Sequence, residues 1–459
     1  MGSTLDSETQ RRIESFVGDW LVDANVPGAS LALVVDGDVV YSSGFGSRDL
    51  ETNQPATPRT QYGIASGTKS FAGLSILLLE ERTDLSVEDP VEEYVDEFDL
   101  DGADGPITVH DLLTHSSGLP TLRTSTVLLY RLTGVEEHGV PLGDREDFYR
   151  HLNGAQDEIA GSRGERLMYC NSGYNVLGDI VEAVSGVAFD EFVESEILDP
   201  LGMVRSTFDP ETVDEDAMTP YALQDGKPEA TPFPHRPVSY AAGGLIAPVT
   251  DLTRYLRMHA NGGTFDGVEL VSERSLTRAH TGYMERADSE YGYGWGRSEF
   301  CGRTLVGHGG SLGVSSSYIG FTTDGEYAIA LAANTTPSPT PPTVAKGVLA
   351  ILAGEDPPAE VPYFAREQRF EELTGEYESY RGITMAAVEQ RAGVLELTIE
   401  HALGEESLVL LPKNPEQPGN EFETPTTLGV RKDVRFEQHG DHVDLYYDRN
   451  RLHQVQGTV

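Results

Sequence analysis

The sequence feature that most constrains the fold is a long apolar segment, residues 71–79 (FAGLSILLL), which follows Ser66 and Lys69 closely. The segment is long enough for a helix and too apolar to lie on a surface, so it predicts a buried helix. Ser66 and Lys69 are three residues apart near its start, hence on one face and within reach of each other. The rest of the chain must therefore fold around this helix.

The same pair suggests chemistry. A serine hydroxyl is a poor nucleophile until a neighbouring group takes its proton, and a desolvated lysine can do so. The helix N-terminus adds partial positive charge where negative charge would form on the serine and on a substrate oxyanion. Of the 33 Lys and Arg residues only five are lysine, at positions 69, 227, 346, 413 and 432, which favours a function for Lys69. A short S-x-x-K pattern also arises by chance in long chains.

Tyr169, Cys170 and Asn171 form a second candidate motif, predicted to lie in a turn just before a helix. A tyrosine can act as a general base if a neighbouring cation, such as Lys69, lowers its pKa. Asn171 offers both a donor and an acceptor to a substrate amide or ester. Cys170 is either a small buried side chain, the favoured interpretation, or a reactive thiol.

Residues 307–311 (GHGGS) form a third candidate motif, just before a predicted pair of strands. Glycines beside a strand let a substrate approach the backbone, and an exposed N–H there can complete an oxyanion hole. Taken alone, the motif could be only a tight turn. Residues 439–442 (HGDH) could chelate a metal, but their place between strands favours a turn, and packing or capping is expected of His110 and His115. No metal site is predicted.

Composition bounds the architecture and the setting. A chain of 459 residues is too long for one typical domain, so two or three are expected. No apolar run reaches the 18 residues of a membrane span, and the polar residues 1–10 do not look like a secretory signal. Two cysteines, Cys170 and Cys301, suit a reducing compartment, so a cytoplasmic location is expected.

The chain is strongly acidic, with 75 Asp and Glu residues and a formal net charge of -42. Nucleic acid and anionic membranes are poor partners for such a surface. The 38% of hydrophobic residues, placed in periodic runs, argues against disorder. Dense acidic residues with few lysines suggest the surface of a halophile, where salt screens self-repulsion, and an acidic mesophile is the alternative.

Periodicity and turn residues give a coarse map of the first 353 residues. Asp36–Gly37 and Asp324–Gly325 are hairpin signals. Thr108, with Asp111 three residues on, predicts a helix start. Together these features suggest a sheet with helices on its faces. The map predicts helices over 8–24, 176–185, 190–198, 251–260 and 344–352, strands over 29–35, 39–43, 318–322 and 327–333, and irregular or loop segments over 121–165 and 209–237.

The character of the chain changes after residues 354–362, which hold three prolines and predict an interdomain linker. Beyond the linker, short strands separated by turns suggest a small all-β barrel or sandwich. These strands are predicted over 384–391, 394–399, 408–411, 434–438, 442–447 and 451–455.

The three motifs, in this order and at these spacings, resemble the serine β-lactamase and penicillin-binding-protein superfamily. The match is best to its class C branch of β-lactamase-related serine hydrolases, which includes esterases and D-aminopeptidases. Residues 110–119 and 242–245 are further matches, and the resemblance covers roughly residues 8–353. The family's S-x-x-K, Y-x-N and K-T-G or H-x-G motifs would here be Ser66 and Lys69, Tyr169 and Asn171, and His308, Gly309 and Gly310.

This resemblance implies an α/β (α+β) fold, with an antiparallel sheet flanked by helices and a helical subdomain. It implies a serine hydrolase domain over 1–353, a linker over 354–362, and an all-β domain over 363–459 that more weakly resembles a lipocalin-like domain. It implies no cofactor. The expected partners are a small-molecule or peptide substrate, with no nucleic acid and no membrane, and a homo-oligomer is possible.

The resemblance also implies roles. Ser66 would attack the carbonyl, Tyr169 with Lys69 would shuttle its proton, and water would then release the acyl group, with Tyr169 the better deacylation base. The backbone N–H groups of Ser66 and Ser311 would hold the oxyanion. Substrate would contact Asn171, His308, Gly309, Gly310 and Ser311.

One departure from the family concerns substrate choice. Lactamases and D,D-peptidases have a lysine where this chain has His308, which is mostly neutral at pH 7 if unperturbed. Hydrolysis of small esters is therefore the leading interpretation. D-Aminopeptidase, related peptidase or β-lactamase activity is the near alternative. A catalytically silent binding or regulatory protein on the same fold is the alternative from another class.

Overall fold

The computed structural model describes residues 4–124, 127, 143–233, 239–401, 404–414, 419–426, 429–440 and 442–455. The chain divides into two compact units, Met1–Ala353 and Gly354–Val459. Part of the segment 121–165 that was expected to be irregular, part of the expected loop 209–237, and Asp441 of the HGDH segment lie outside the described residues.

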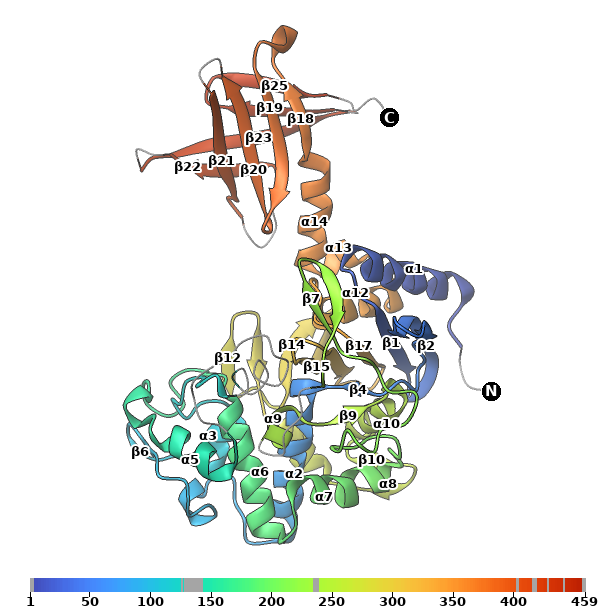
Figure 1. Ribbon diagram of the computed structural model, residues 1–459, viewed down its shortest axis with the longest axis vertical. Coiled ribbons are helices and arrows are strands. Elements are labelled where there is room, and N and C mark those ends of the chain that lie inside the picture. Colours follow the sequence, from blue (N-terminus) through green and yellow to red (C-terminus); the bar gives the residue numbers. More distant parts are fainter. Residues whose placement is uncertain are drawn as a thin grey trace. The chain divides into compact units, whose positions relative to one another are not determined.

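The first unit is built on a nine-stranded antiparallel sheet (Figure 1). The predicted hairpin at Asp36–Gly37 is confirmed: both residues have positive φ angles, 50° and 80°, as a tight two-residue turn requires. In spatial order the strands are β12 (Met284–Arg286), β13 (Ser289–Tyr291), β14 (Gly296–Phe300), β15 (Arg303–Ser311), β16 (Ser316–Thr322), β17 (Tyr327–Ala333), β1 (Gly28–Val35), β2 (Asp38–Asp49) and β3 (Gln54–Pro55).

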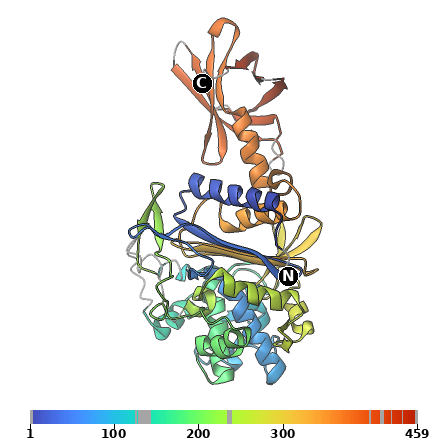
Figure 2. The same ribbon diagram turned by 90° about the vertical axis from the view of Figure 1, so that its right-hand side faces the viewer.

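Helices cover both faces of this sheet, as Figure 2 shows edge on. The helices α1 (Ser7–Asp23) and α12 (Pro341–Leu352) pack together on one face, and α10 (Val249–Ala260) packs on the other. The helix α1 begins where the Asp6 carboxylate accepts the backbone N–H groups of Glu8 and Thr9, and it buries its apolar stripe. The sheet flanked by helices that the sequence predicted is thus confirmed.

The predicted buried helix is α2 (Thr68–Arg82), in which every residue from Thr68 to Leu79 is buried. It packs against α6 (Asn171–Ser185) and α9 (Tyr240–Gly243) in a helical region below the sheet. Thr108 and Asp111 form the predicted reciprocal cap of a helix, α3. Other helices in the described part of the unit include α3 (Val109–Leu113), α5 (Arg145–Asn153), α7 (Phe189–Val193), the π-helical turn η4 (Glu194–Leu198), α8 (Asp199–Leu201) and α11 (Glu273–Ala279).

Two expectations for this unit need correction. The segment expected to be irregular contains α5, and the expected surface loop contains a hairpin of β7 (Tyr221–Gln224) and β8 (Lys227–Ala230). The hairpin turns at Asp225–Gly226, a dipeptide of the same kind as those at the predicted hairpins. The surrounding prolines and acidic residues concealed this signal. The other short strands are β4 (Tyr62–Gly63), β5 (Asp101–Gly102), β6 (Gly105–Pro106), β9 (Ile246–Ala247), β10 (Thr264–Phe265) and β11 (Val268–Glu269).

The second unit contains a closed antiparallel barrel, so the predicted small all-β domain is confirmed. Two helices precede it, α13 (Pro357–Glu360) and α14 (Pro362–Leu373), and Phe370 and Leu373 of α14 join the barrel's apolar core. The sequence predicted neither helix, nor β18 and β22. The strands are β18 (Gly375–Glu378), β19 (Met385–Arg391), β20 (Val394–His401), β21 (Gly404–Pro412), β22 (Glu421–Pro425), β23 (Arg431–His439), β24 (His442–Tyr447) and β25 (Asn450–Gln454).

The search for membrane-spanning helices gave a negative result. Among the described residues, no helix combines the length and the apolarity needed to cross a bilayer.

Candidate active site

Ser66 lies in a one-turn 3-10 helix, η1 (Ala65–Gly67), which leads directly into α2. Ala65, the preceding residue, has a φ of 52°, in the left-handed region that alanine rarely adopts. Such strain persists only where the surroundings enforce it, and it recurs at functional sites. The backbone thus holds Ser66 at a sharp turn at the head of the central helix.

Lys69 lies beside the serine and is completely buried. Its Nζ donates to Ser66 Oγ at 3.0 Å and to the backbone carbonyl of Ala242 at 2.6 Å. Burial lowers the pKa of Lys69 to about 7, because the interior disfavours the charged ammonium. A large fraction of this lysine is therefore neutral near pH 7 and can accept a proton from Ser66.

Tyr169 shares this cluster, with its ring centroid 5.0 Å from Lys69 Nζ. The sequence led us to expect that the neighbouring lysine lowers the tyrosine pKa. The structure corrects that expectation, because burial raises the pKa of Tyr169 and a hydrogen bond to Ser66 only partly opposes the effect. In this state Tyr169 is a proton donor, and Lys69 is the better base.

Asn171 is the first residue of α6, which begins earlier than predicted. Its side-chain Oδ1 is buried and has no hydrogen-bond partner among the described residues. Buried polar atoms normally form hydrogen bonds, so an amide oxygen without a partner at a cleft is available to accept one from a ligand. The amide therefore suits contact with a substrate N–H.

Cys170 and His115 pack against the motif formed by Tyr169 and Asn171. Cys170 is buried, as expected of a small packed side chain, and burial raises the pKa of its thiol. The Cys170 backbone N–H donates to His115 Nδ1 at 3.2 Å, and the imidazole lies 4.2 Å from the Tyr169 ring, centroid to centroid. His115 is itself buried, so the expectation that it packs agrees with the structure.

His308 lies on β15 and is 8% exposed. Its Nδ1–H donates to the Gly309 carbonyl at 2.6 Å, which leaves Nε2 to accept the Tyr291 hydroxyl at 3.0 Å. Burial lowers the pKa of His308 to about 3, and the nearby charge of Lys69 acts in the same direction. The imidazole is therefore neutral at pH 7.

The glycines of β15 let the strand approach the serine turn. A Cβ atom on Gly310 would lie 2.0 Å from the Ile64 carbonyl oxygen, where no side chain can fit. Ser311, the last residue of β15, pairs with Ser316 and is exposed. The C-terminal end of β15 thus lies beside η1, and Ser311 is the last residue of the strand.

All the predicted residues except the buried Lys69 line one cleft of about 720 Å³, together with residues that the sequence did not single out. Among the latter, Arg286 and Lys346 bring positive charge, and Asp288 brings one negative charge. In the described part of the chain, neither Arg286 nor Lys346 is held in an ion pair. Lys346 could have been noticed, since lysine is so scarce in this chain, but only folding brings α12 to the cleft.

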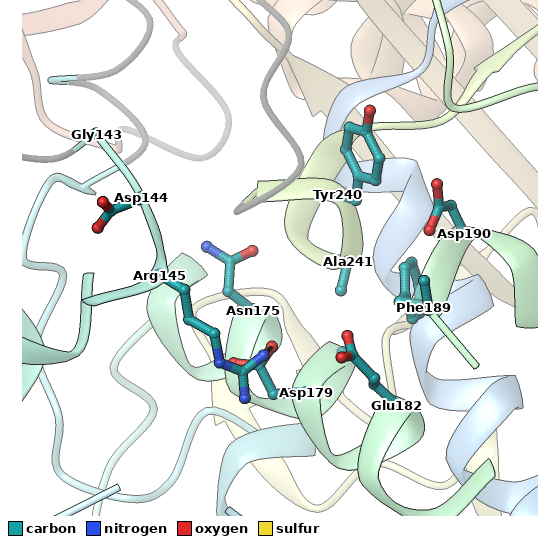
Figure 3. A pocket seen from close by; sticks show the side chains of 12 residues that line it. Gly143, Asp144, Arg145, Asn175, Asp179, Glu182, Phe189, Asp190, Tyr240 and Ala241 are labelled. Atoms are coloured by element: carbon teal, nitrogen blue, oxygen red, sulfur yellow. Dashed lines mark hydrogen bonds and ion pairs between the residues drawn. The ribbon is translucent and has the colours of Figure 1, made fainter. Parts of the chain in front are cut away.

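A separate cavity of about 470 Å³ lies beside α6 and α9 (Figure 3). Its lining includes four acidic residues, Asp144, Asp179, Glu182 and Asp190. Arg145 points toward Asp179 and bonds to it. Burial raises the pKa of Asp179 to about 6. The described residues that line this cavity include none of those predicted to act in catalysis, so the cleft at Ser66 remains the candidate active site.

Comparison with known proteins identifies the class. Residues 9–353 match the Beta-lactamase family, and residues 357–453 match the Pab87 octamerisation domain family. The octameric penicillin-binding protein homologue from Pyrococcus abyssi has the same fold with a TM-score of 0.88 and 34% sequence identity, covering 97% of this chain and all of that chain.

Two curated relatives match more distantly. Protein flp of Staphylococcus aureus (strain COL) is 28% identical over 335 residues, which are 72% of this chain and 64% of the relative. D-Aminopeptidase of Brucella anthropi is 28% identical over 304 residues, 65% of this chain and 54% of the relative. The chain thus spans less than two thirds of the length of these relatives.

The first unit therefore belongs to the β-lactamase family of serine hydrolases. Within that family the chain is related to the Flp proteins and D-aminopeptidase, it is a homologue of penicillin-binding proteins, and its second unit belongs to the Pab87 octamerisation domain family. The resemblance noted in the sequence is confirmed.

Proposed function

We propose that this protein is an active serine hydrolase that works through an acyl-enzyme on Ser66. The observation that carries the proposal is the fully buried Lys69, with a pKa of about 7, whose Nζ lies 3.0 Å from Ser66 Oγ. A base with a pKa near the working pH combines a large deprotonated fraction with good proton-accepting strength.

In the proposed reaction, neutral Lys69 takes the Ser66 hydroxyl proton while Oγ bonds to the substrate carbonyl carbon. The backbone N–H groups of Ser66 and Ser311 would stabilise the oxyanion. The bond to the leaving group then breaks, and Tyr169 passes a proton to that group and is reprotonated from Lys69. Water attacks the acyl-enzyme and gives its proton back through the same residues, so the acid leaves and Ser66 is restored.

A fluorophosphonate probe tests the nucleophile. Wild-type protein should take up one label at Ser66, and Ser66→Ala should take up none. Ser75→Ala is a matched control, because Ser75 lies on α2, the helix that follows the serine turn, and its hydroxyl donates to the Phe71 carbonyl. Labelling at another serine, or none in folded wild-type protein, would favour a silent binding protein.

Small neutral esters are the proposed substrates. A lysine at position 308 would give a permanent cation for a substrate carboxylate, whereas the neutral His308 gives at most a hydrogen bond. Hydrogen bonds to charged groups contribute roughly 1.5–3 kcal/mol against about 1 for neutral pairs, which is on the order of tenfold in discrimination. A nitrophenyl ester should therefore show higher kcat/KM than a chromogenic cephalosporin at matched high salt, and His308→Lys should narrow the gap.

A second candidate, a peptidase or β-lactamase acting on a substrate with a carboxylate, is favoured by Arg286 and Lys346 in the cleft. The substrate carboxylate would then be bound by Arg286 on β12 or by Lys346 on α12, and not by a cation at position 308. In that case Lys346→Gln should raise KM for the cephalosporin about tenfold and leave the neutral ester unchanged. If wild-type protein prefers the cephalosporin, this candidate replaces the ester hydrolase.

We propose that the protein is a homo-oligomer. The match of residues 357–453 to an octamerisation domain family, and the octameric state stated for the Pyrococcus abyssi homologue, support this. Light scattering after size exclusion at high salt should give a mass several times that of one chain. A monomer over the micromolar range would contradict the proposal.

We also propose the domain limits 1–353 and 363–459, with 354–362 as the linker, and a lipocalin-like character for the barrel. The latter is supported by its eight consecutive antiparallel strands closed on themselves. A reducing, intracellular setting is proposed as well, supported by the two cysteines, Cys170 and Cys301, neither of which forms a disulfide bond in the described part of the chain.

A further inference from the structure

Three histidines surround a buried carboxylate on the barrel of the second unit. Asp444 lies on β24 and is completely inaccessible to solvent. Its neighbours Val443 and Leu445 point into the apolar core of the barrel, so the Asp444 side chain points to the opposite face of the strand. His439 on β23, His442 on β24 and His453 on β25 lie next to it and are each about four-tenths exposed. The register explains the gathering, since β24 pairs Asp444 with His453.

The distances suit a shared cation. His453 Nδ1 lies 2.5 Å from Asp444 Oδ1, and His442 Nε2 lies 3.9 Å from the same oxygen. One ligand atom from each of these three residues falls within 4.8 Å of the others. Ligands of a tetrahedral zinc ion, each at about 2.0–2.1 Å, are about 3.4 Å apart, so shifts of roughly 1 Å or less would complete the site.

The surroundings orient the carboxylate. Arg451 donates from Nε and from its terminal nitrogen to Asp444 Oδ2, at 2.9 and 2.6 Å. That contact leaves Oδ1 directed at His442 and His453. Partners of this kind commonly fix a ligating carboxylate. His439 Nε2 lies 3.3 Å from Oδ2 and is in place for a fourth ligand or for a supporting bond.

We propose that His442, Asp444 and His453 form a zinc site on the barrel, with His439 or water as the fourth ligand. Imidazole and carboxylate ligands with a few open positions fit zinc better than calcium or magnesium, which prefer oxygen ligands. The net charge of -42 favours cation binding in addition. The sequence had favoured a plain turn at 439–442, of which Asp441 lies outside the described residues. The strands pair His439 with His442, and folding adds Asp444 and His453 to these two histidines.

The position gives the ion a structural role. Strands β18 and β25 close the barrel through two residue pairs, Tyr377 with Gln454 and Glu378 with His453. An ion bound by side chains of both β24 and β25 would hold β25 in place beside its short pairing with β18. Zinc should therefore stabilise the closed barrel.

The test uses the full chain, stripped with a chelator and titrated with zinc chloride by calorimetry at high salt. Wild-type protein should bind one zinc per chain, and His442→Ala and His453→Ala should each bind at least about 10-fold more weakly. His151→Ala, which removes a histidine from the first unit, is the matched control and should bind as wild type does. Equal affinity in all variants would show adventitious binding to surface carboxylates and overturn the proposal, as would no binding at micromolar zinc.

Two further readouts separate ligation from loss of folding. Cobalt chloride should give wild-type protein the visible absorption of a four-coordinate cobalt ion, and His453→Ala should lack it while keeping the wild-type circular dichroism. Zinc should slow amide hydrogen exchange over β25 in wild-type protein only. Zinc binding without slower exchange in β25 would place the ion elsewhere and overturn the proposal.

Discussion

At the scale of single residues, the candidate site depends on one unusual environment. Lys69 is fully buried, and among the described residues its hydrogen-bond acceptors are the Ser66 hydroxyl and the Ala242 backbone carbonyl. The same burial moves the pKa of Tyr169 upward. In the proposed mechanism the two groups therefore take opposite roles, the lysine as proton acceptor and the tyrosine as proton donor.

The pH dependence of activity follows from Lys69. Because the neutral amine is the base, kcat/KM should rise with pH up to about 7, close to tenfold per unit on the acid side, and level off above it. Lys69→Arg, which stays protonated, should lose about 10²- to 10⁴-fold in kcat/KM and lose the acid limb. The measurement is a pH profile with a neutral ester.

Lys227→Arg is the matched control, since Lys227 lies exposed on β8 and should keep the wild-type profile. An unchanged acid limb in Lys69→Arg would show that another group titrates, and the assignment of the base would fail.

At the scale of elements, the site depends on how closely β15 approaches η1. Ser317 on the neighbouring strand donates to the Ile64 carbonyl at 2.7 Å, and Gly310 leaves that carbonyl the room it needs. This bond holds β16, the partner strand of β15, against the residue that precedes the serine turn, and β15 lies close to the same residue.

Gly310→Ala tests this contact. The added methyl group would meet the Ile64 oxygen at 2.0 Å and push the serine turn and β15 apart. We expect kcat/KM to fall by about 10²-fold or more, since small misplacements at a reacting centre are costly, with a loss of stability of about 1–3 kcal/mol. Thermal melting and ester kinetics measure the two effects.

Gly18→Ala on α1 is the control, because no atom lies within 4 Å of its added methyl group. It should keep full activity and gain up to about 1 kcal/mol. If Gly310→Ala were as active as Gly18→Ala, the close approach would have no part in catalysis.

At the scale of the whole molecule, charge and domain structure dominate. The chain carries 75 acidic against 33 basic side chains, so self-repulsion opposes folding at low salt. Many arginines form exposed ion pairs, such as Arg150 with Glu146, which salt weakens. Such pairs contribute little each, and the unpaired acidic excess should outweigh them.

Folded stability should therefore rise steeply with salt. A melting series from roughly 0.1 M to several molar KCl takes the Debye length from about 10 Å to below 3 Å. We expect Tm to climb across the whole range. A flat series would remove the argument for a salt-adapted protein.

The proposed linker makes a separate prediction. Limited proteolysis should cut first within or beside residues 354–362 and release a fragment that ends near residue 353. The short helix α13 should be cut more slowly than its flanks, because a helix must unfold to enter a protease. Early cuts confined to the first 350 residues would contradict the boundary.

Local sequence determined much of this protein. The hairpin at Asp36–Gly37 needs only the backbone freedom of two residues, and the turn at Asp324–Gly325 needs that of Gly325. The spacing of Ser66 and Lys69 follows from helix geometry. Such features depend on neighbours a few positions away, so a pattern can reveal them. The sequence did not predict the helix α14, because its buried apolar residues pack against a barrel whose strands come later in the chain.

Tertiary structure alone decided what the site can do. The pKa of Lys69 depends on the burial of its side chain. Its Nζ also donates a hydrogen bond to the carbonyl of Ala242, which is 173 positions away in the sequence. A local sequence pattern can predict neither of these. Lys346 reaches the cleft, and His453 reaches Asp444, only once strands and helices have packed. A shifted pKa and a set of metal ligands both depend on the distances between side chains and on how far water is excluded from them. Both quantities are defined only in the folded chain.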